Sequence, residues 1–159
     1  MKKRTLITAL FCSALLLPVA RGWAGHDMAT MDHDMATMEM PGKDAKTISL
    51  PAAHQDGVMA KADLHDVREA MAKHGMKETH HLMVMFTDMK EGKPLTAGAA
   101  ALKVTPPAGS KGAPLKMMLM GDGFGTDVDL SAPGRYGFEV GTKLDDGKKR
   151  VFTFTHDNK

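Results

Sequence analysis

The sequence predicts an all-β fold: an antiparallel β-sandwich of about seven strands with one short helix, preceded by a disordered tail. Two observations lead to this prediction. From residue 58 onward, short segments of alternating apolar and polar side chains are separated by turns rich in glycine and proline, which is typical of a sandwich. Residues 25–40, in contrast, contain no branched aliphatic or aromatic side chain, so they cannot bury enough apolar surface to offset the entropy lost on ordering.

Residues 1–24 have the features of a cleaved secretory signal peptide. A basic start, Met1–Arg4, is followed by an apolar run over residues 6–20, and the small residues Gly22 and Ala24 place the cleavage site after Ala24. The apolar run is short for a membrane span, and Cys12 lacks the preceding small residues of a lipidation site. We therefore expect a soluble periplasmic protein with no membrane anchor in its mature form.

Removal of this segment changes the composition of the chain. The remaining 135 residues fit one domain and a tail, and the net charge falls from +2 to −2, so nothing favours nucleic-acid binding. The only cysteine and the only tryptophan, Cys12 and Trp23, are also lost, which excludes a disulfide, a thiolate metal site, covalently attached haem and a blue-copper centre. All eight histidines and 14 of the 15 methionines remain, and this excess of methionine needs a functional reason.

The arm that follows, residues 25–40, contains the hexapeptide His-Asp-Met-Ala-Thr-Met twice without change, at 26–31 and at 33–38. A thioether is a neutral, polarizable donor that suits Cu(I) and Ag(I), imidazole adds a nitrogen donor, and the interspersed carboxylates attract cations. An amino group at Gly25 beside His26 would also chelate Cu(II). The alternative is a solvated low-complexity arm without a ligand. The candidate metal ligands of the arm are His26, Met28, Met31, His33, Met35, Met38 and Met40.

The chain divides into the signal peptide (1–24), a flexible tail and linker (25–57) and a folded domain (58–159), with one short extended piece over 47–50 inside the linker. In the domain, a strand over 58–64 precedes a helix over 66–74 that ends at Gly75. Further strands are expected over 80–88, 96–105, 115–120, 124–130, 135–144 and 150–156. Tyr136, just after Pro133-Gly134, lies where a tyrosine corner would enter the penultimate strand, which favours an immunoglobulin-like topology.

Two segments of the sequence resemble known families. Phe86-Thr87-Asp88, Gly92–Leu95 and Ala132–Val140 together resemble the YtkA-like and FixH-type immunoglobulin-like domains over residues 58–156. This resemblance implies a small envelope module, with another copper protein or an oxidase as its partner. Met31-Asp32-His33-Asp34-Met35 is similar to the Met-Asp-His-x-x-Met repeats of periplasmic copper and silver resistance proteins. It departs from them at Asp34, where serine or glycine is usual.

A second group of metal-ligand candidates lies inside the domain. On strand alternation His81, Met83 and Met85 share one face, and Met118 and Met120 share one face of another strand. If the two strands belong to one sheet, the five side chains line one methionine-rich surface. The alternatives are that these methionines fill the core, since methionine adapts to irregular gaps, or that the helix covers them. For the histidine, the alternative is a strand-end residue.

These observations lead to one functional hypothesis and two rivals. No nucleophile elbow, phosphate-binding loop or suggestive carboxylate pair is present, so we do not expect an enzyme. Asp127 is expected to be solvated, and Gly123 and Gly125 are interpreted as turn and bulge residues. We expect a periplasmic copper chaperone or buffer that binds Cu(I), or Ag(I). The rivals are an oxidase-assembly type of interaction module with incidental metal binding, and a solute or haem carrier.

Overall fold

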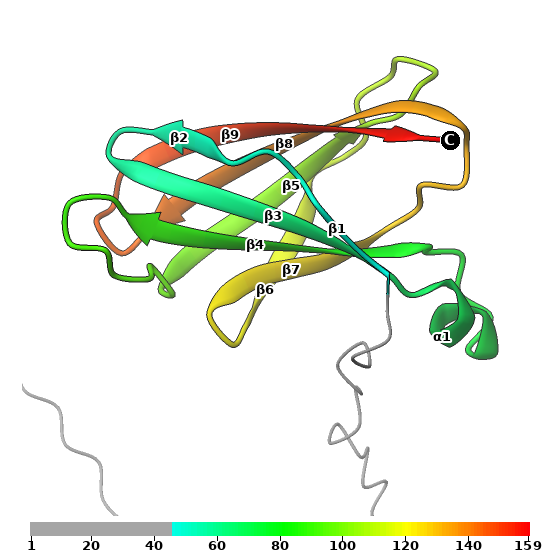
Figure 1. Cartoon of the computed structure of the whole chain (residues 1–159), viewed down its shortest axis with the longest axis horizontal. Coiled ribbons are helices and arrows are strands. Elements are labelled where there is room, and N and C mark those ends of the chain that lie inside the picture. The colour runs from blue at the N-terminus through cyan, green and yellow to red at the C-terminus, as the bar shows by residue number, and fades with distance from the viewer. Residues whose placement is uncertain (1–45) are drawn as a thin grey trace, which may run out of the picture. The chain divides into compact units, whose positions relative to one another are not determined.

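The computed structural model describes residues 46–159, which form nine β-strands and one short α-helix (Figure 1). The predicted signal peptide and the methionine-rich arm lie outside the described residues. The elements are β1 (Thr47–Ser49), β2 (Ala53–Gln55), β3 (Val58–Asp66), α1 (Arg68–Lys73), β4 (His80–Asp88), β5 (Gly98–Thr105), β6 (Leu115–Met120), β7 (Gly123–Val128), β8 (Gly134–Leu144) and β9 (Lys149–Asn158).

The strands pair into one curled sheet with the form of a half-barrel (Figure 1). All the pairings between strands are antiparallel, and neighbours follow the order β1-β3-β4-β7-β6-β5-β8-β9, with β2 paired to β3 beside β1. Strand β6 joins the two halves, because residues 115–117 pair with β5 and residues 118–120 pair with β7. The curl therefore depends on one strand that passes from one layer to the other.

The seven longer strands have the order of an immunoglobulin-like domain. Strands β3-β4-β7-β6 form one layer and β5-β8-β9 form the other. If these seven strands are numbered in chain order, the first layer has the order one-two-five-four and the second has the order three-six-seven. This is the order of a constant-type immunoglobulin domain. The predicted all-β class with an immunoglobulin-like order is thus confirmed.

The folded part of the chain begins earlier than residue 58, where the sequence placed the end of the linker. The extended piece expected at 47–50 forms β1, and β2 follows it, both paired with the free edge of β3. Asp56 and Gly57, with φ of 45° and 76°, make the two-residue turn from β2 into β3. An Asp-Gly pair is a strong hairpin signal, because the type I′ turn needs positive φ at both positions. The expected extended piece is therefore confirmed, and the prediction of a linker is wrong for residues 53–57, which form β2 and its turn.

Helix α1 is shorter than the predicted span of 66–74. It begins later because Asp66 still pairs with His80 in the ladder between β3 and β4. It ends as predicted, with His74 as its C-cap and Gly75 at a φ of 69°. The helix buries none of its side chains. Within residues 46–159 no helix has the length and apolar character needed to cross a membrane.

The core lies between the two layers and is built from the inward residues of alternating strands. Phe86 of β4 is at its centre, with ring centroids 5.9 Å from Phe124 and 5.3 Å from Phe152. The other large side chains that are fully buried are aliphatic or aromatic: Val58, Leu64, Leu82, Val84, Leu102, Leu130, Phe138 and Val140. Each contributes about 1.5–3 kcal/mol on burial, so this set holds the layers together.

The predicted tyrosine corner is present at the start of β8. The buried hydroxyl of Tyr136 donates a hydrogen bond to the Ala132 carbonyl oxygen and accepts one from the Ala132 N–H, each at 3.0 Å. Asn158 of β9 donates to the same carbonyl oxygen at 3.1 Å and to the Leu130 carbonyl oxygen at 2.6 Å. The connection from β7 to β8 is thereby tied to the end of the last strand.

Replacing Tyr136 by phenylalanine keeps the ring in the core and removes only the hydroxyl. The Ala132 N–H then loses its partner in a partly buried place, so the free energy of unfolding should fall by about 1–3 kcal/mol. Urea denaturation of both proteins measures this difference. An unchanged midpoint would show that the corner does not stabilise the fold.

Candidate functional site

Strand β4 carries the first half of the candidate site on its outer side. Leu82, Val84 and Phe86 are fully buried, so the alternating residues face away from the core. Those residues are His81, Met83 and Met85. His81 is buried at 8 % exposure, and the two methionines are half-buried. The predicted division of this strand into an apolar face and a histidine-methionine face is therefore correct.

Strand β7 lies between β4 and β6 and brings the two predicted groups together. In register, Gly125 of β7 is opposite Met83 on one side and Met118 on the other. Gly123 is likewise opposite Met85 and Met120. Directly paired residues of an antiparallel sheet point to the same side. His81, Met83, Met85, Met118 and Met120 thus share one outer surface, which we call the methionine face.

The two glycines form the floor of the methionine face. A Cβ atom on Gly125 would collide with His81 Nε2 and would lie 3.3 Å from Met120 Sδ. A Cβ atom on Gly123 would lie 3.0 Å from Met83 Sδ and 3.2 Å from Met85 Cγ. The donor atoms therefore lie directly over bare backbone. The interpretation of these glycines as turn or bulge residues was wrong, since both are buried inside β7.

Asp127 fixes the ring of His81. The two residues are opposite each other on β7 and β4, and His81 Nδ1 lies 2.7 Å from Asp127 Oδ1. A carboxylate only accepts hydrogen bonds, so Nδ1 carries the proton and donates it. In the neutral ring this leaves Nε2, above Gly125, with a free lone pair for a metal ion. The expectation that Asp127 is merely solvated was therefore wrong.

The methionines of the face do not belong to the core. Among the methionines in residues 46–159, only Met117 is buried, and it belongs to the core cluster. Met118 is 62 % exposed, and Met83, Met85 and Met120 are half-buried on the outer side. Helix α1, which contains Met71, buries none of its residues. The interpretation of these four methionines as core residues is therefore wrong.

Sequence reasoning predicted strand β3 but missed that it lies beside β4. The outward residues of β3 lie opposite those of β4 in the ladder: His65 is opposite His81, Asp63 is opposite Met83 and Lys61 is opposite Met85. The alternation of β3 was visible in the sequence, but its pairing with β4 was not. The structure thus adds a second imidazole and a second carboxylate beside the predicted donors.

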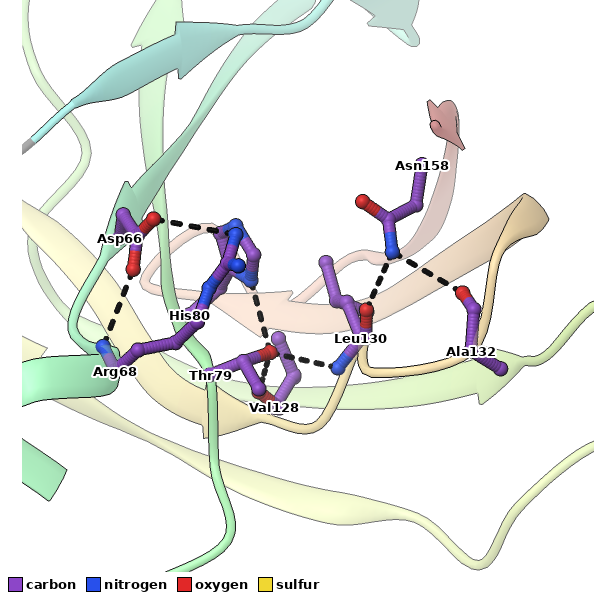
Figure 2. A network of polar contacts seen from close by, with 8 residues as sticks. All are labelled: Asp66, Arg68, Thr79, His80, Val128, Leu130, Ala132 and Asn158. Carbon is purple, nitrogen blue, oxygen red and sulfur yellow. Dashed lines mark hydrogen bonds and ion pairs between the residues drawn. The ribbon is translucent and has the colours of Figure 1, made fainter. Parts of the chain in front are cut away.

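His80, next to His81, has a structural role instead (Figure 2). The residue is 2 % exposed, and its Nδ1 lies 2.9 Å from Thr79 Oγ1. The same hydroxyl oxygen accepts a hydrogen bond from the Leu130 N–H at 2.8 Å. Burial lowers the pKa of His80 below its usual value, and the nearby Asp66 opposes this effect only in part. The ring is therefore mostly neutral at neutral pH. Figure 2 shows how it links the end of β3 to the chain that leaves β7.

Within residues 46–159 no three His, Cys, Asp or Glu side chains come together in a way that could hold a metal ion. A hollow of about 240 Å³ beside His80 is lined by Lys46, Arg68 and Lys159 as well as by Asp66 and Asp157. Such mixed charge gives no concentrated donor set for a cation. A different donor set, of thioethers, lies on the methionine face.

The remaining predicted ligands lie outside the described residues. They are His26, Met28, Met31, His33, Met35, Met38 and Met40. Comparison of the chain with family models, with curated proteins and with solved structures gave no match. The resemblance to YtkA-like and FixH-type domains, and that of the arm to copper and silver resistance repeats, therefore remain predictions from sequence motifs.

Alanine at Gly125 tests whether the floor positions His81. The new Cβ would collide with His81 Nε2, so the imidazole should move and its hydrogen bond to Asp127 should weaken. NMR of the histidine side chains should show a clear shift of the His81 ring resonances. Gly141→Ala is the matched control, because a Cβ there meets nothing closer than 3.9 Å. Equal spectra for both variants would contradict the arrangement.

Proposed function

We propose that this chain is a periplasmic protein that binds Cu(I), with Ag(I) as the alternative soft ion, and that it serves as a copper chaperone or buffer without catalytic activity. The observation that carries this proposal is the methionine face. Four thioethers and one imidazole from β4 and β6 gather above the two glycines of β7.

The donor set of the face matches a soft ion. Thioether sulfur is neutral and polarizable, so it binds Cu(I) and Ag(I) and discriminates against Ca²⁺ and Mg²⁺. His81 adds one nitrogen whose orientation is set by Asp127, as is usual for metal-binding histidines. With the sulfur of Met120 and the Nε2 of His81 above the same glycine, a single ion can contact both after small rotations of the side chains.

The exposure of the face favours transfer over permanent storage. Met118 is 62 % exposed and the other three methionines are half-buried, so an incoming ligand has direct access to a bound ion. Thioether ligands carry no proton, so their binding does not weaken as the medium becomes acidic, whereas imidazole must be deprotonated. In this proposal the arm, residues 25–40, captures copper, and the face supplies a second site on the folded domain.

One observation favours the rival function of an interaction module. Leu119 of β6 is 52 % exposed and lies opposite Phe124, on the other side of the sheet from the methionine face, so an apolar side chain is available there to another envelope protein. A partner that docked there would leave the methionine face open. The two functions differ in whether copper binds in the absence of a partner.

Titration with Cu(I) against a competing chromophoric chelator distinguishes them. We expect the protein that begins at Gly25 to bind more than one equivalent. Changing Met83, Met85, Met118 and Met120 together to leucine removes the sulfur atoms at nearly constant volume, so it should abolish binding at the domain while the fold is retained. Deleting residues 25–40 should remove the remaining sites.

The matched control changes Met71, Met76 and Met89 to leucine, because these methionines lie on α1 and in turns away from the face. It should leave the Cu(I) stoichiometry unchanged. Unchanged binding in the deletion variant would reject the role of the arm. If the intact protein bound no Cu(I) and a partner were recovered by crosslinking, the interaction module would be the correct function.

A further inference from the structure

The methionines of the face are exposed to solvent in a graded order. Met118 is 62 % exposed, whereas Met83, Met85 and Met120 are half-buried. Its neighbour in sequence, Met117, points to the opposite side of β6 and belongs to the core, with 3 % exposure. Two consecutive methionines thus differ almost completely in their access to a reagent in solution. Since thioether sulfur is oxidised where an oxidant can reach it, Met118 is the first target on the face.

Backbone covers two of the sulfur atoms on their inner side. Met83 Sδ lies 3.0 Å from the position that a Cβ atom on Gly123 would occupy, and Met120 Sδ lies 3.3 Å from the corresponding position at Gly125. An oxidant therefore reaches these sulfur atoms only from the outer side of the sheet. A soft ion would approach from that same side. An oxygen atom and a metal ion thus compete for the same lone pairs of sulfur.

We propose that the methionine face is a reversible oxidation site, at which a peroxide converts the thioethers to sulfoxides and so prevents binding of the soft ion. This inference rests on the proposed function, because it concerns the same four sulfur atoms. In the step, sulfur donates an electron pair to one oxygen of hydrogen peroxide, so an S–O bond forms and the O–O bond breaks. The hydroxide that leaves takes the proton of the transferred oxygen and becomes water, while sulfur has lost two electrons.

Oxidation changes the donor atom that the face offers. A thioether presents a soft, polarizable sulfur atom, whereas a sulfoxide presents a hard oxygen atom, which does not suit Cu(I) or Ag(I). A bound ion, in turn, holds the sulfur lone pairs and keeps them from the oxidant. The face is therefore either loaded with metal or oxidised, and a peroxide blocks the loading of empty protein.

The fold permits this change because the face does not contribute to the core. The core cluster contains Met117 and none of the four methionines of the face. A polar sulfoxide at Met118 remains in solvent, whereas one at Met117 would lie between the two layers and destabilise the domain. The oxidised domain therefore stays folded and accessible to a methionine sulfoxide reductase. In that reaction a dithiol supplies two electrons and two protons and becomes a disulfide, the thioether is restored, and the oxygen leaves as water.

Site-resolved mass spectrometry of the full chain that begins at Gly25 tests the order of oxidation. With limiting hydrogen peroxide, we expect the sulfoxide of Met118 to form before those of the other three methionines of the face, with Met117 still reduced. Ag(I) added before the peroxide should slow oxidation of all four. Met89 is the matched control, because it is 56 % exposed and follows the end of β4 away from the face, so Ag(I) should leave its oxidation rate unchanged.

A second measurement follows the binding of the ion. After oxidation of the face, Ag(I) should no longer shift the methyl resonances of its methionines, and reductases for both sulfoxide epimers should restore the shifts. The midpoint of urea denaturation should stay close to that of the reduced protein.

Unchanged Ag(I) binding after oxidation, unfolding on oxidation of the face, or oxidation of Met117 as early as Met118 would overturn the inference and leave the proposed function intact. Ag(I) titration of the reduced protein separates the two proposals. Absence of binding there would reject the metal site itself, and the inference with it.

Discussion

The register of β7 between β4 and β6 is the constraint on which the candidate site depends. It puts Gly123 and Gly125 between two pairs of methionines, so four thioethers face one another across a strand that has no side chain in between. A shift of one residue would turn the glycines inward and would place Phe124 on the outer side, because side chains alternate along a strand. The Phe124 ring is buried against Phe86, so that shift would expose it to solvent and is unfavourable. The packing of the core therefore also fixes the positions of the site residues.

The core and the methionine face are separate parts of the same layer. The inward residues of β4 are Leu82, Val84 and Phe86, which are rigid and fully buried. The outward residues include the two flexible thioethers of Met83 and Met85, which remain half-buried. Because the apolar core already closes the two layers, the methionines contribute little that another apolar residue could not provide. Their concentration on one outer surface is therefore better explained by the sulfur atoms than by stability.

The sequence predicted the fold well where the signal was local. Alternation defined β4 and β6 to the residue, and Tyr136 after Pro133-Gly134 indicated the tyrosine corner and with it the immunoglobulin-like order. Pairing between distant strands has no such local signal. For that reason His65 was not recognised as a neighbour of His81, and Asp127 was taken as solvated. The Asp56-Gly57 turn was a local signal that could have revealed β2. The strand before this turn is only three residues long, so its alternation was too short to be recognised.

Methyl NMR of the methionines during titration with Ag(I) tests the central claim most directly, because Ag(I) is a diamagnetic soft ion and each methyl group reports on its own sulfur atom. The account predicts that the methyl resonances of Met83, Met85, Met118 and Met120 shift as Ag(I) is added, while those of Met71, Met89 and the buried Met117 do not. Shifts confined to methionines before residue 46, or no shift at all, would contradict a soft-metal site on the outer face of the domain.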